Sequence, residues 1–241
     1  MKKHSVLVVV HGYSGDQRQI EELMPMYEHH GYPVVIASPA DSPITKVGPH
    51  ICITAGKKCY IGQDSWDRQH LQLKSLLQFP QDWFLLNDSD SFVLTPELPD
   101  YLFRDDNIVW SNEVDDFRKP GESWQGNPPW PKDYHKGYPL IAMQPPYFLS
   151  RKALQKIVDA SAGLQACPIC PFIDWWWIPA SYKAGVKHRR FTGCASCETV
   201  TPMGLAVMSQ CIRERQATFI HSVKSGSVMQ QLKAIYDQTK P

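Results

Sequence analysis

Two carboxylates follow directly on a strongly apolar stretch of the sequence. Asp88 and Asp90, with Ser89 between them, come after residues 83–87, which read WFLLN and predict a buried strand. Open parallel sheets bind their ligands beyond the carboxyl ends of the strands. Residues two apart lie on the same side of an extended chain, so both carboxylates can serve one hard cation or the groups bound to it. A solvated turn is the alternative, and the apolar strand before the pair favours the cation site.

The elements that must position this pair begin with a β-α-β pattern. Residues 5–10 are a β-branched run that predicts a buried strand, and residues 32–37 predict the next one. Between them a helix is expected after Asp16, which can cap it together with Gln19. Pro25 is expected to kink or shorten that helix. This opening predicts a parallel sheet with a right-handed crossover.

Further elements follow at regular intervals. A polar, Pro-, Gly- and Trp-rich loop is expected over residues 113–139, and Ser150 can cap the helix after it. The remaining expected strands cover residues 50–54, 108–112 and 140–143, and the remaining helices cover residues 63–78 and a segment from about 226 to the C-terminus.

The segment WFLLNDSDSFVL resembles the metal-binding D-x-D segment of GT-A glycosyltransferases, enzymes that move a sugar from a nucleotide-sugar donor to an acceptor. The resemblance covers roughly residues 5–225, because the β-α-β opening matches the nucleotide-binding half and residues 147–154 are similar to the helix start after the acceptor loop. It implies an α/β fold: a Rossmann-type mixed, mostly parallel sheet flanked by helices, with long acceptor-side loops and a Cys-rich insertion. It also implies one catalytic domain over residues 1–241, with a nucleotide-sugar half (1–110), an acceptor half (111–225) and a C-terminal helix (226–241).

The resemblance assigns roles to two further residues. His221 stands where many such enzymes supply a late histidine to the metal, beside Asp88 and Asp90. Carboxylates with one imidazole suit Mn²⁺ as well as or better than Mg²⁺. Asp174 stands where the family carries its catalytic base, which implies inversion at the sugar, although Ile173 replaces the usual acidic neighbour. A packed histidine and a helix-capping aspartate are the alternatives.

The same resemblance places the nucleotide-sugar, most simply a UDP-sugar, on the first half of the chain. Beyond Ser89, the expected contacts are His11, Gly12, Tyr13, Asp41, Asp67 and Arg68. Tyr13 would stack on the base, Asp41 or Asp67 would accept from base or ribose, and Arg68 would reach the diphosphate. A loop aromatic, a turn residue and an exposed helical pair are the plain alternatives.

The cysteines form two C-x2-C pairs, Cys167 with Cys170 and Cys194 with Cys197, out of seven in the chain. Their spacing fits a structural four-cysteine zinc site that would staple the loop bearing Asp174. Disulfides or unpaired thiols remain as alternatives.

The aromatic residues predict an acceptor platform built from Trp124, Trp130, Trp175 and Trp176. Three consecutive tryptophans cannot all face one way, so at least one of residues 175–177 is expected in the core. The basic residues at 183 and 187–190 can contact the phosphates of a nucleic acid, or form a solvated face. The acceptor is therefore expected to be a glycan or protein, or a hydroxymethylated base in viral DNA.

Composition limits the partners. With 25 Lys plus Arg against 24 Asp plus Glu, the net charge of +1 supplies no global field for nucleic acid or anionic lipid. The N-terminal apolar run, residues 6–10, is too short for a signal peptide or membrane span, so a cytoplasmic enzyme is expected, in the host cytoplasm if viral.

Two other functions fit parts of the sequence. A zinc-ribbon binding module explains the cysteines but leaves the first 110 residues without a role. The His11-Gly12 pair resembles the oxyanion segment of α/β-hydrolases, but the sequence has no G-x-S-x-G nucleophile elbow.

Overall fold

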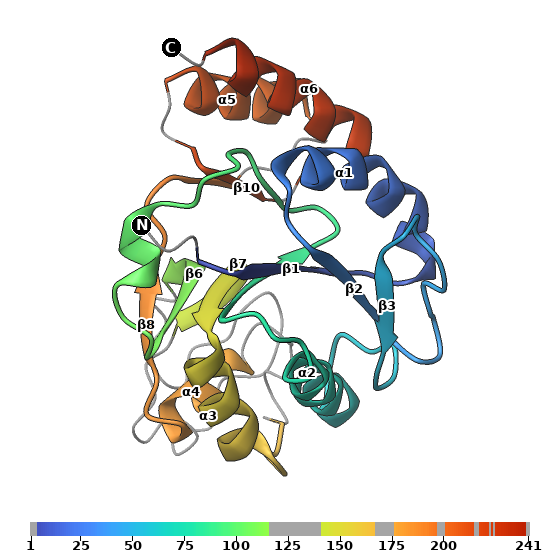
Figure 1. The fold of residues 1–241 in the computed structure, drawn as a ribbon, viewed down its shortest axis with the longest axis vertical. Helices are drawn as coiled ribbons and strands as arrows, with labels where there is room; N and C mark the ends of the chain where they lie inside the picture. The colour runs from blue at the N-terminus through green and yellow to red at the C-terminus, as the bar shows by residue number, and fades with distance from the viewer. Residues whose placement is uncertain are drawn as a thin grey trace.

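The computed structural model describes residues 4–115, 141–166, 176–196, 201–214, 217–221, 223 and 225–239. Over these residues the chain forms two sheets and two layers of helices (Figure 1). The strands are β1 (Val6–His11), β2 (Val34–Ser38), β3 (Ile51–Thr54), β4 (Trp83–Asp88), β5 (Phe92–Val93), β6 (Ile108–Asp115), β7 (Ile141–Ser150), β8 (Lys187–Arg190), β9 (Cys194–Ser196) and β10 (Phe219–His221). The helices are α1 (Gln17–His30), α2 (Gln63–Leu76), α3 (Arg151–Ser161), α4 (Trp177–Lys183), α5 (Pro202–Arg213) and α6 (Gly226–Gln238), with 3-10 turns at Ser14–Asp16 and Asp100–Phe103.

The larger sheet has seven strands in the order β3-β2-β1-β4-β7-β6-β8. Strands β3, β2, β1 and β4 run parallel, β7 is antiparallel to both of its neighbours, and β8 is parallel to β6. A smaller sheet joins β5, β10 and β9. The predicted α/β class and its mixed, mostly parallel sheet are therefore confirmed, and the β1-α1-β2 opening supplies the expected crossover.

Strand β1 shows why the first half of the sheet has continuous apolar runs. Val8 and Val10 pack into the core on one face, whereas Leu7 and Val9 pack into the core on the other. Helices α1, α5 and α6 cover the first face, and α2, α3 and α4 cover the second (Figure 1). Since both faces are buried, neither carries the polar alternation of a half-exposed strand.

Helix α1 departs from the sequence-based expectation at Pro25. The helix continues past this proline to His30 and ends at Gly31, whose φ of 73° is left-handed. Its buried face includes Ile20, Leu23 and Tyr27, so tertiary packing stabilises a helix in which one backbone hydrogen bond is missing. The expected shortening at Pro25 is wrong.

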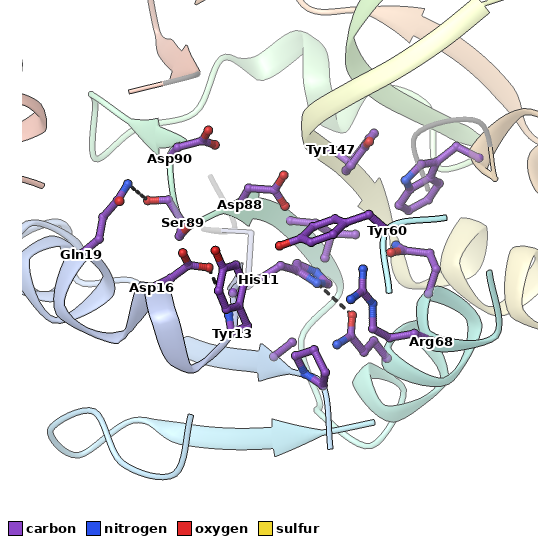
Figure 2. Close-up of a pocket in the computed structure, with 17 residues that line it drawn as sticks. His11, Tyr13, Asp16, Gln19, Tyr60, Arg68, Asp88, Ser89, Asp90 and Tyr147 are labelled. Atoms are coloured by element: carbon purple, nitrogen blue, oxygen red, sulfur yellow. Dashed lines mark hydrogen bonds between the residues drawn. The ribbon is translucent and has the colours of Figure 1, made fainter. Parts of the chain in front are cut away.

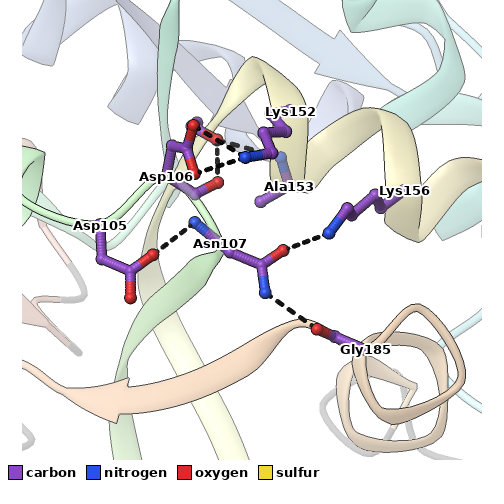
Figure 3. A network of polar contacts seen from close by, with 8 residues as sticks. Asp105, Asp106, Asn107, Lys152, Ala153, Lys156 and Gly185 are labelled. Carbon is purple, nitrogen blue, oxygen red and sulfur yellow. Dashed lines mark hydrogen bonds and ion pairs between the residues drawn. The ribbon is translucent and has the colours of Figure 1, made fainter.

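The start of α3 confirms the predicted cap and ties three elements together. The Ser150 hydroxyl accepts from the Ala153 amide at 3.0 Å. Lys152 pairs with the Asp106 carboxylate at 2.9 Å in the turn before β6 (Figure 3). Beside it, Asn107 accepts from the Lys156 ammonium at 2.7 Å and donates to the Gly185 carbonyl at 2.9 Å (Figure 3). These bonds join α3 to the starts of β6 and β8, on the side of the sheet that α3 and α4 cover.

Two strands in the structure have other bounds than the sequence predicts. Strand β6 extends to Asp115, into the expected loop, and β7 is one strand of ten residues rather than a short strand followed by a break. None of the helices in the described ranges has the length and apolarity needed to cross a membrane.

Burial of His30 between α1 and the smaller sheet predicts a loss of stability in mild acid. Burial lowers the pKa of His30 to about 4, with further lowering by Lys233 and His29 and a raising effect of Asp237. Because the unfolded chain takes up this proton near pH 6.5, the free energy of unfolding should fall as the pH drops from about 6.5 towards 4. His30→Leu should remove roughly 1–3 kcal/mol of that fall.

Urea unfolding at pH 7 and pH 4.5 measures this difference. His29→Leu, on the exposed neighbour, is the matched control and should keep most of the wild-type pH dependence, because burial and Lys233 contribute more than His29 to the lowered pKa of His30. If the free energy of unfolding falls by the same amount between pH 7 and pH 4.5 in all three proteins, the assignment to His30 is contradicted.

Candidate functional site

A cavity of about 420 Å³ opens at the carboxyl ends of β1 and β4. Figure 2 shows Asp88, Ser89 and Asp90 on one side of it, Tyr13 and Asp16 on a second, and Arg68 and Tyr60 on a third. Its walls come from the β1–α1 turn, α2, the loop before α2, the turn after β4 and the side chains of Tyr147 and Trp177. The volume lies within the range of small-molecule sites, and the position is where open α/β sheets bind ligands.

The turn that carries the two carboxylates is held by backbone and side-chain hydrogen bonds. The Ser91 amide donates to the Asp88 carbonyl at 3.0 Å, and the Val223 amide donates to the Asp90 carbonyl at 3.0 Å. From α1, the Gln19 side chain donates to the Ser89 carbonyl at 2.8 Å and to the Val223 carbonyl at 3.1 Å (Figure 2 shows the first). The turn is therefore fixed to α1 and to the segment after β10.

A further hydrogen bond, from the Asn87 side chain to α1, fixes the strand just before the turn. The Asn87 amide donates to the Tyr27 hydroxyl at 2.7 Å, and both side chains are buried. Neither Gln19 nor Tyr27 was predicted as a site residue. No local pattern marks Gln19 as a partner of residues 89 and 223.

His221 and Asp90 lie close together, as the family resemblance implies. The His221 Nε2 atom lies 3.8 Å from Asp90 Oδ1, and both side chains are largely buried. Two ligands that each lie about 2.1 Å from one ion are about 3 to 4 Å apart, so this separation fits a shared cation. Within the described ranges no three His, Cys, Asp or Glu side chains cluster closely enough to hold a metal. Asp88 lines the same cavity without completing such a cluster.

Asp16 adds a carboxylate that was predicted only as a helix cap. Its side chain makes no capping bond to α1 and instead accepts from the Tyr13 amide at 3.1 Å, which closes the β1–α1 turn. Burial raises the pKa of Asp16, a bond with Ser89 opposes this, and the nearby Asp90 charge adds to it. Asp16, Asp88 and Asp90 thus make this side of the cavity strongly negative and favourable for a cation.

His11 ends β1 at the back of the cavity. Its Nδ1 lies 3.1 Å from the Gln72 Oε1 of α2 (Figure 2), and His11 is the register partner of Asp88. Burial lowers the pKa of His11 to about 4, and the Arg68 charge contributes while the Gln72 bond opposes it. His11 is therefore neutral at pH 7 and presents a hydrogen-bonding, uncharged surface.

Arg68 is the cationic side chain among the described residues that line the cavity. It is nearly buried, which lowers its pKa, and Asp88 and Tyr60 oppose the lowering. Its guanidinium carbon lies 5.8 Å from the centre of the Tyr60 ring. This placement beside Asp88 agrees with the predicted role of Arg68 at an anionic ligand.

Two predicted nucleotide contacts lie elsewhere. Asp41 is exposed, outside the cavity lining, and its carboxylate accepts from the Lys58 amide at 2.6 Å. Asp67 accepts from Gln63 at 2.7 Å and lines a separate cavity with Trp66 and His70. Successive helical residues differ by about 100° in direction, so Arg68, Gln69 and Gln72 face the site and Asp67 does not.

The acceptor-side predictions are described only in part. Asp174, Trp124, Trp130 and Trp175 lie outside the described residues. Trp176 is fully buried in the core beneath α3 and α4, so its predicted role in an exposed acceptor platform is wrong. Trp177 is also buried but borders the cavity, where its ring lies 4.5 Å from that of Tyr147.

The zinc prediction rests on residues of which one is described. Cys194 lies partly buried in β9, while Cys167, Cys170 and Cys197 lie outside the described residues. The four-cysteine zinc site therefore stays a prediction.

Comparison with known proteins finds no matching family model and no matching curated sequence. Among solved structures, a galactosyltransferase, LgtC, in complex with donor and acceptor sugar analogues, is similar with a TM-score of 0.50 and 10% identity, over 98% of this chain and 96% of that one. The fold is GT-A-like. The glycosyltransferase GlyE of Streptococcus pneumoniae is similar at a TM-score of 0.48 and 13% identity, over 98% of this chain and 63% of that one. A 4-diphosphocytidyl-2C-methyl-D-erythritol synthase of Anaerococcus prevotii is similar at a TM-score of 0.41 and 10% identity, over 78% of this chain and 88% of that one. The similarity to LgtC extends over nearly the whole of both chains, so the GT-A-like fold is not confined to the first four parallel strands.

Proposed function

We propose that this protein is a metal-dependent glycosyltransferase that moves a sugar from a nucleoside diphosphate sugar, most simply a UDP-sugar, to an acceptor hydroxyl. The observation that supports this most directly is the cavity at the ends of β1 and β4. There the Asp90 carboxylate lies 3.8 Å from the His221 imidazole, next to Asp88 and within the same lining as Arg68.

The donor set fits a divalent cation. Asp90 and His221 would hold the ion, and Asp88 lines the same cavity. Oxygen ligands with one imidazole suit Mn²⁺ well. When bound, the ion supplies positive charge that stabilises the departing diphosphate.

The residues of the chain account for the remaining tasks at the donor. Arg68 places a second positive charge beside the diphosphate, and neutral His11 with Gln72 offers hydrogen bonds without adding charge. Tyr13 offers an aromatic face at the cavity edge for the base. Gln19 and Tyr27 hold the carboxylate-bearing turn, which keeps Asp90 in position opposite His221.

The transfer itself breaks the bond between the anomeric carbon and the phosphate oxygen and forms a bond from that carbon to the acceptor oxygen. The bonding electrons leave with the nucleoside diphosphate. We propose that Asp174 takes the acceptor proton, so that direct displacement inverts the anomeric carbon. A glycan or protein acceptor is proposed first, and a hydroxymethylated base in viral DNA second, because the exposed strand β8 carries Lys187, Arg189 and Arg190.

Calorimetry with UDP tests this proposal. UDP should bind about tenfold or more tightly with Mn²⁺ than with EDTA, because the ion joins two negatively charged partners. Uridine, which has no diphosphate, is the matched ligand control and should show no dependence on Mn²⁺. If UDP, GDP, CDP and dTDP each bind with the same affinity in Mn²⁺ as in EDTA, the proposal is contradicted.

Donor specificity is then identified by incubation with a panel of nucleotide-sugars. Slow donor hydrolysis, followed by mass spectrometry, should release one nucleoside diphosphate and its free sugar. Release of a nucleoside monophosphate with a sugar phosphate would instead point to attack at phosphorus, and would overturn the assignment as a glycosyltransferase.

A further inference from the structure

The loop between β3 and α2, residues 55–62, carries two lysines that the assigned site does not use. Lys57 and Lys58 are both exposed, and Tyr60 and Ile61 beyond them are about half exposed. The loop borders the cavity, since Tyr60 lines it next to Arg68 (Figure 2). Its ends are Gly56 and Gly62, with left-handed φ values of 67° and 86°.

The backbone of this loop is held by hydrogen bonds, whereas the Lys58 side chain is held by a cation–π contact with Tyr13. The Lys58 amide donates to Asp41 at 2.6 Å, and the Gly56 carbonyl accepts from the Ala40 amide at 2.8 Å. These bonds fix the loop on the segment after β2. The Lys58 side chain is free to change rotamer without breaking either of them.

The Lys58 ammonium lies on a surface that a nucleotide would need. Its Nζ atom is 3.7 Å from the centre of the Tyr13 ring, and that ring lines the cavity. Tyr13 is partly exposed, and a cation on a ring that water can reach is held only weakly. A base that stacks on this face must displace the ammonium, which in the free protein already lies close enough to Asp16 to help lower the pKa of that carboxyl.

The excess negative charge of the cavity with a diphosphate bound would attract the displaced ammonium. Asp16, Asp88 and Asp90 line the cavity, and among the described lining residues Arg68 alone is cationic. A nucleoside diphosphate adds about three negative charges to such a site. One divalent ion and Arg68 leave this total strongly negative, and a further cation from the cavity edge would offset it.

We propose that Lys58 is a phosphate-binding residue that is stored on Tyr13 in the free protein and exchanges onto the diphosphate when the base takes the Tyr13 ring. The inference rests on the proposed nucleotide site. Base stacking and diphosphate binding become coupled through one side chain, so the protein favours a nucleoside diphosphate over either half alone. Asp41 acts as a positioning residue, because it fixes the backbone from which Lys58 turns.

Binding measurements on Lys58→Gln and Lys58→Arg test the exchange, with Mn²⁺ present throughout. Lys57→Gln is the matched control, since its exposed side chain pairs only loosely with Asp64 at 3.5 Å. Lys58→Gln should weaken UDP binding about tenfold, as expected for the loss of one charge-assisted hydrogen bond. Uridine, measured by NMR titration, should bind equally well or up to about threefold more tightly, because no cation must leave the ring. Lys58→Arg should restore UDP binding, and Lys57→Gln should match the wild type.

The outcomes separate the inference from the function on which it rests. If UDP binds the wild type and Lys58→Gln behaves like Lys57→Gln, the exchange is overturned while the nucleotide site stands. If Lys58→Gln weakens uridine as much as UDP, Lys58 acts through the fold of the loop and the exchange is again overturned. If no nucleoside diphosphate binds the wild type with Mn²⁺, the proposed function fails, and the exchange fails with it.

Discussion

Asp90→Asn is expected to reduce sugar transfer by about 100- to 1,000-fold, the effect of removing one group that stabilises developing charge. The change keeps the size of the side chain and removes its charge at the atom 3.8 Å from His221. The Asp90 carbonyl still accepts from the Val223 amide, so the turn should keep its shape. Transfer and Mn²⁺-linked UDP binding should therefore fall together, and both are measured on the same preparation.

Stability is the internal check on this variant. The Asp90 charge raises the pKa of the half-buried Asp16 carboxyl, so its removal relieves repulsion and should leave the free energy of unfolding unchanged or slightly higher. Asp82→Asn makes the same change just before β4, at the opposite end of the strand, where Asp82 accepts from Ser5 at 3.0 Å. This control should transfer sugar at the wild-type rate. Full activity in Asp90→Asn would remove Asp90 from the mechanism and the metal site with it.

The sequence predicted the place of Asp88 and Asp90 at the end of a buried strand because the signal for it is local. A strand buried on both faces reads as a continuous apolar run, and the carboxylates follow it within three residues. The partner His221 comes from 131 positions later in the chain, and only the family resemblance could bring it to Asp90. Sequence spacing alone contains no information about such a pairing.

The errors come from features that spacing cannot decide. Polar residues on α2 occur on several sides, and burial rather than polarity separates Arg68 from the neighbouring Asp67. Trp176 follows the same reasoning, since its type suits a sugar platform but its packing places it in the core. The Gln19 side chain donates to the backbone carbonyls of residues 89 and 223. Every residue has such a carbonyl, so the sequence does not indicate which ones accept this bond.

One helix was missed although its signal was present. Thr201 caps α5 by accepting from the Gly204 amide at 3.1 Å, and Pro202 occupies the first turn. This is the usual N-terminal pattern of a helix.

Gly56→Ala is expected to cost about 3 kcal/mol or more of folding free energy, a large effect for a single methyl group. The φ of 67° at this position costs about 1 kcal/mol for any residue with a Cβ. The added Cβ would also lie 2.6 Å from both the Cα and the Cβ of Arg68, where ordinary contacts are well above 3 Å. Because one of those atoms is backbone, a rotamer change cannot relieve the overlap, and α2 or the β3–α2 loop must move.

Gly185→Ala separates the two causes. Its φ of 64° is nearly the same, but a Cβ there meets nothing within 4 Å, so it should cost only the backbone preference of about 1 kcal/mol. Urea unfolding of the two variants gives the contribution of the Arg68 contact by difference. If the two variants lose the same free energy of unfolding, the β3–α2 loop can move away from Arg68 at no cost, and the close contact at Gly56 does not hold Arg68 in place.

The same two variants also test the nucleotide site, because Gly56 helps to position both Arg68 and Lys58. Its missing side chain lets the loop approach the α2 backbone at Arg68, and its carbonyl accepts from Ala40 to hold the segment that leads to Lys58. Gly56→Ala should therefore weaken UDP binding at temperatures where the variant is still folded, whereas Gly185→Ala should not. A folded Gly56→Ala protein that bound UDP normally would mean that neither Arg68 nor Lys58 depends on this close approach for its position.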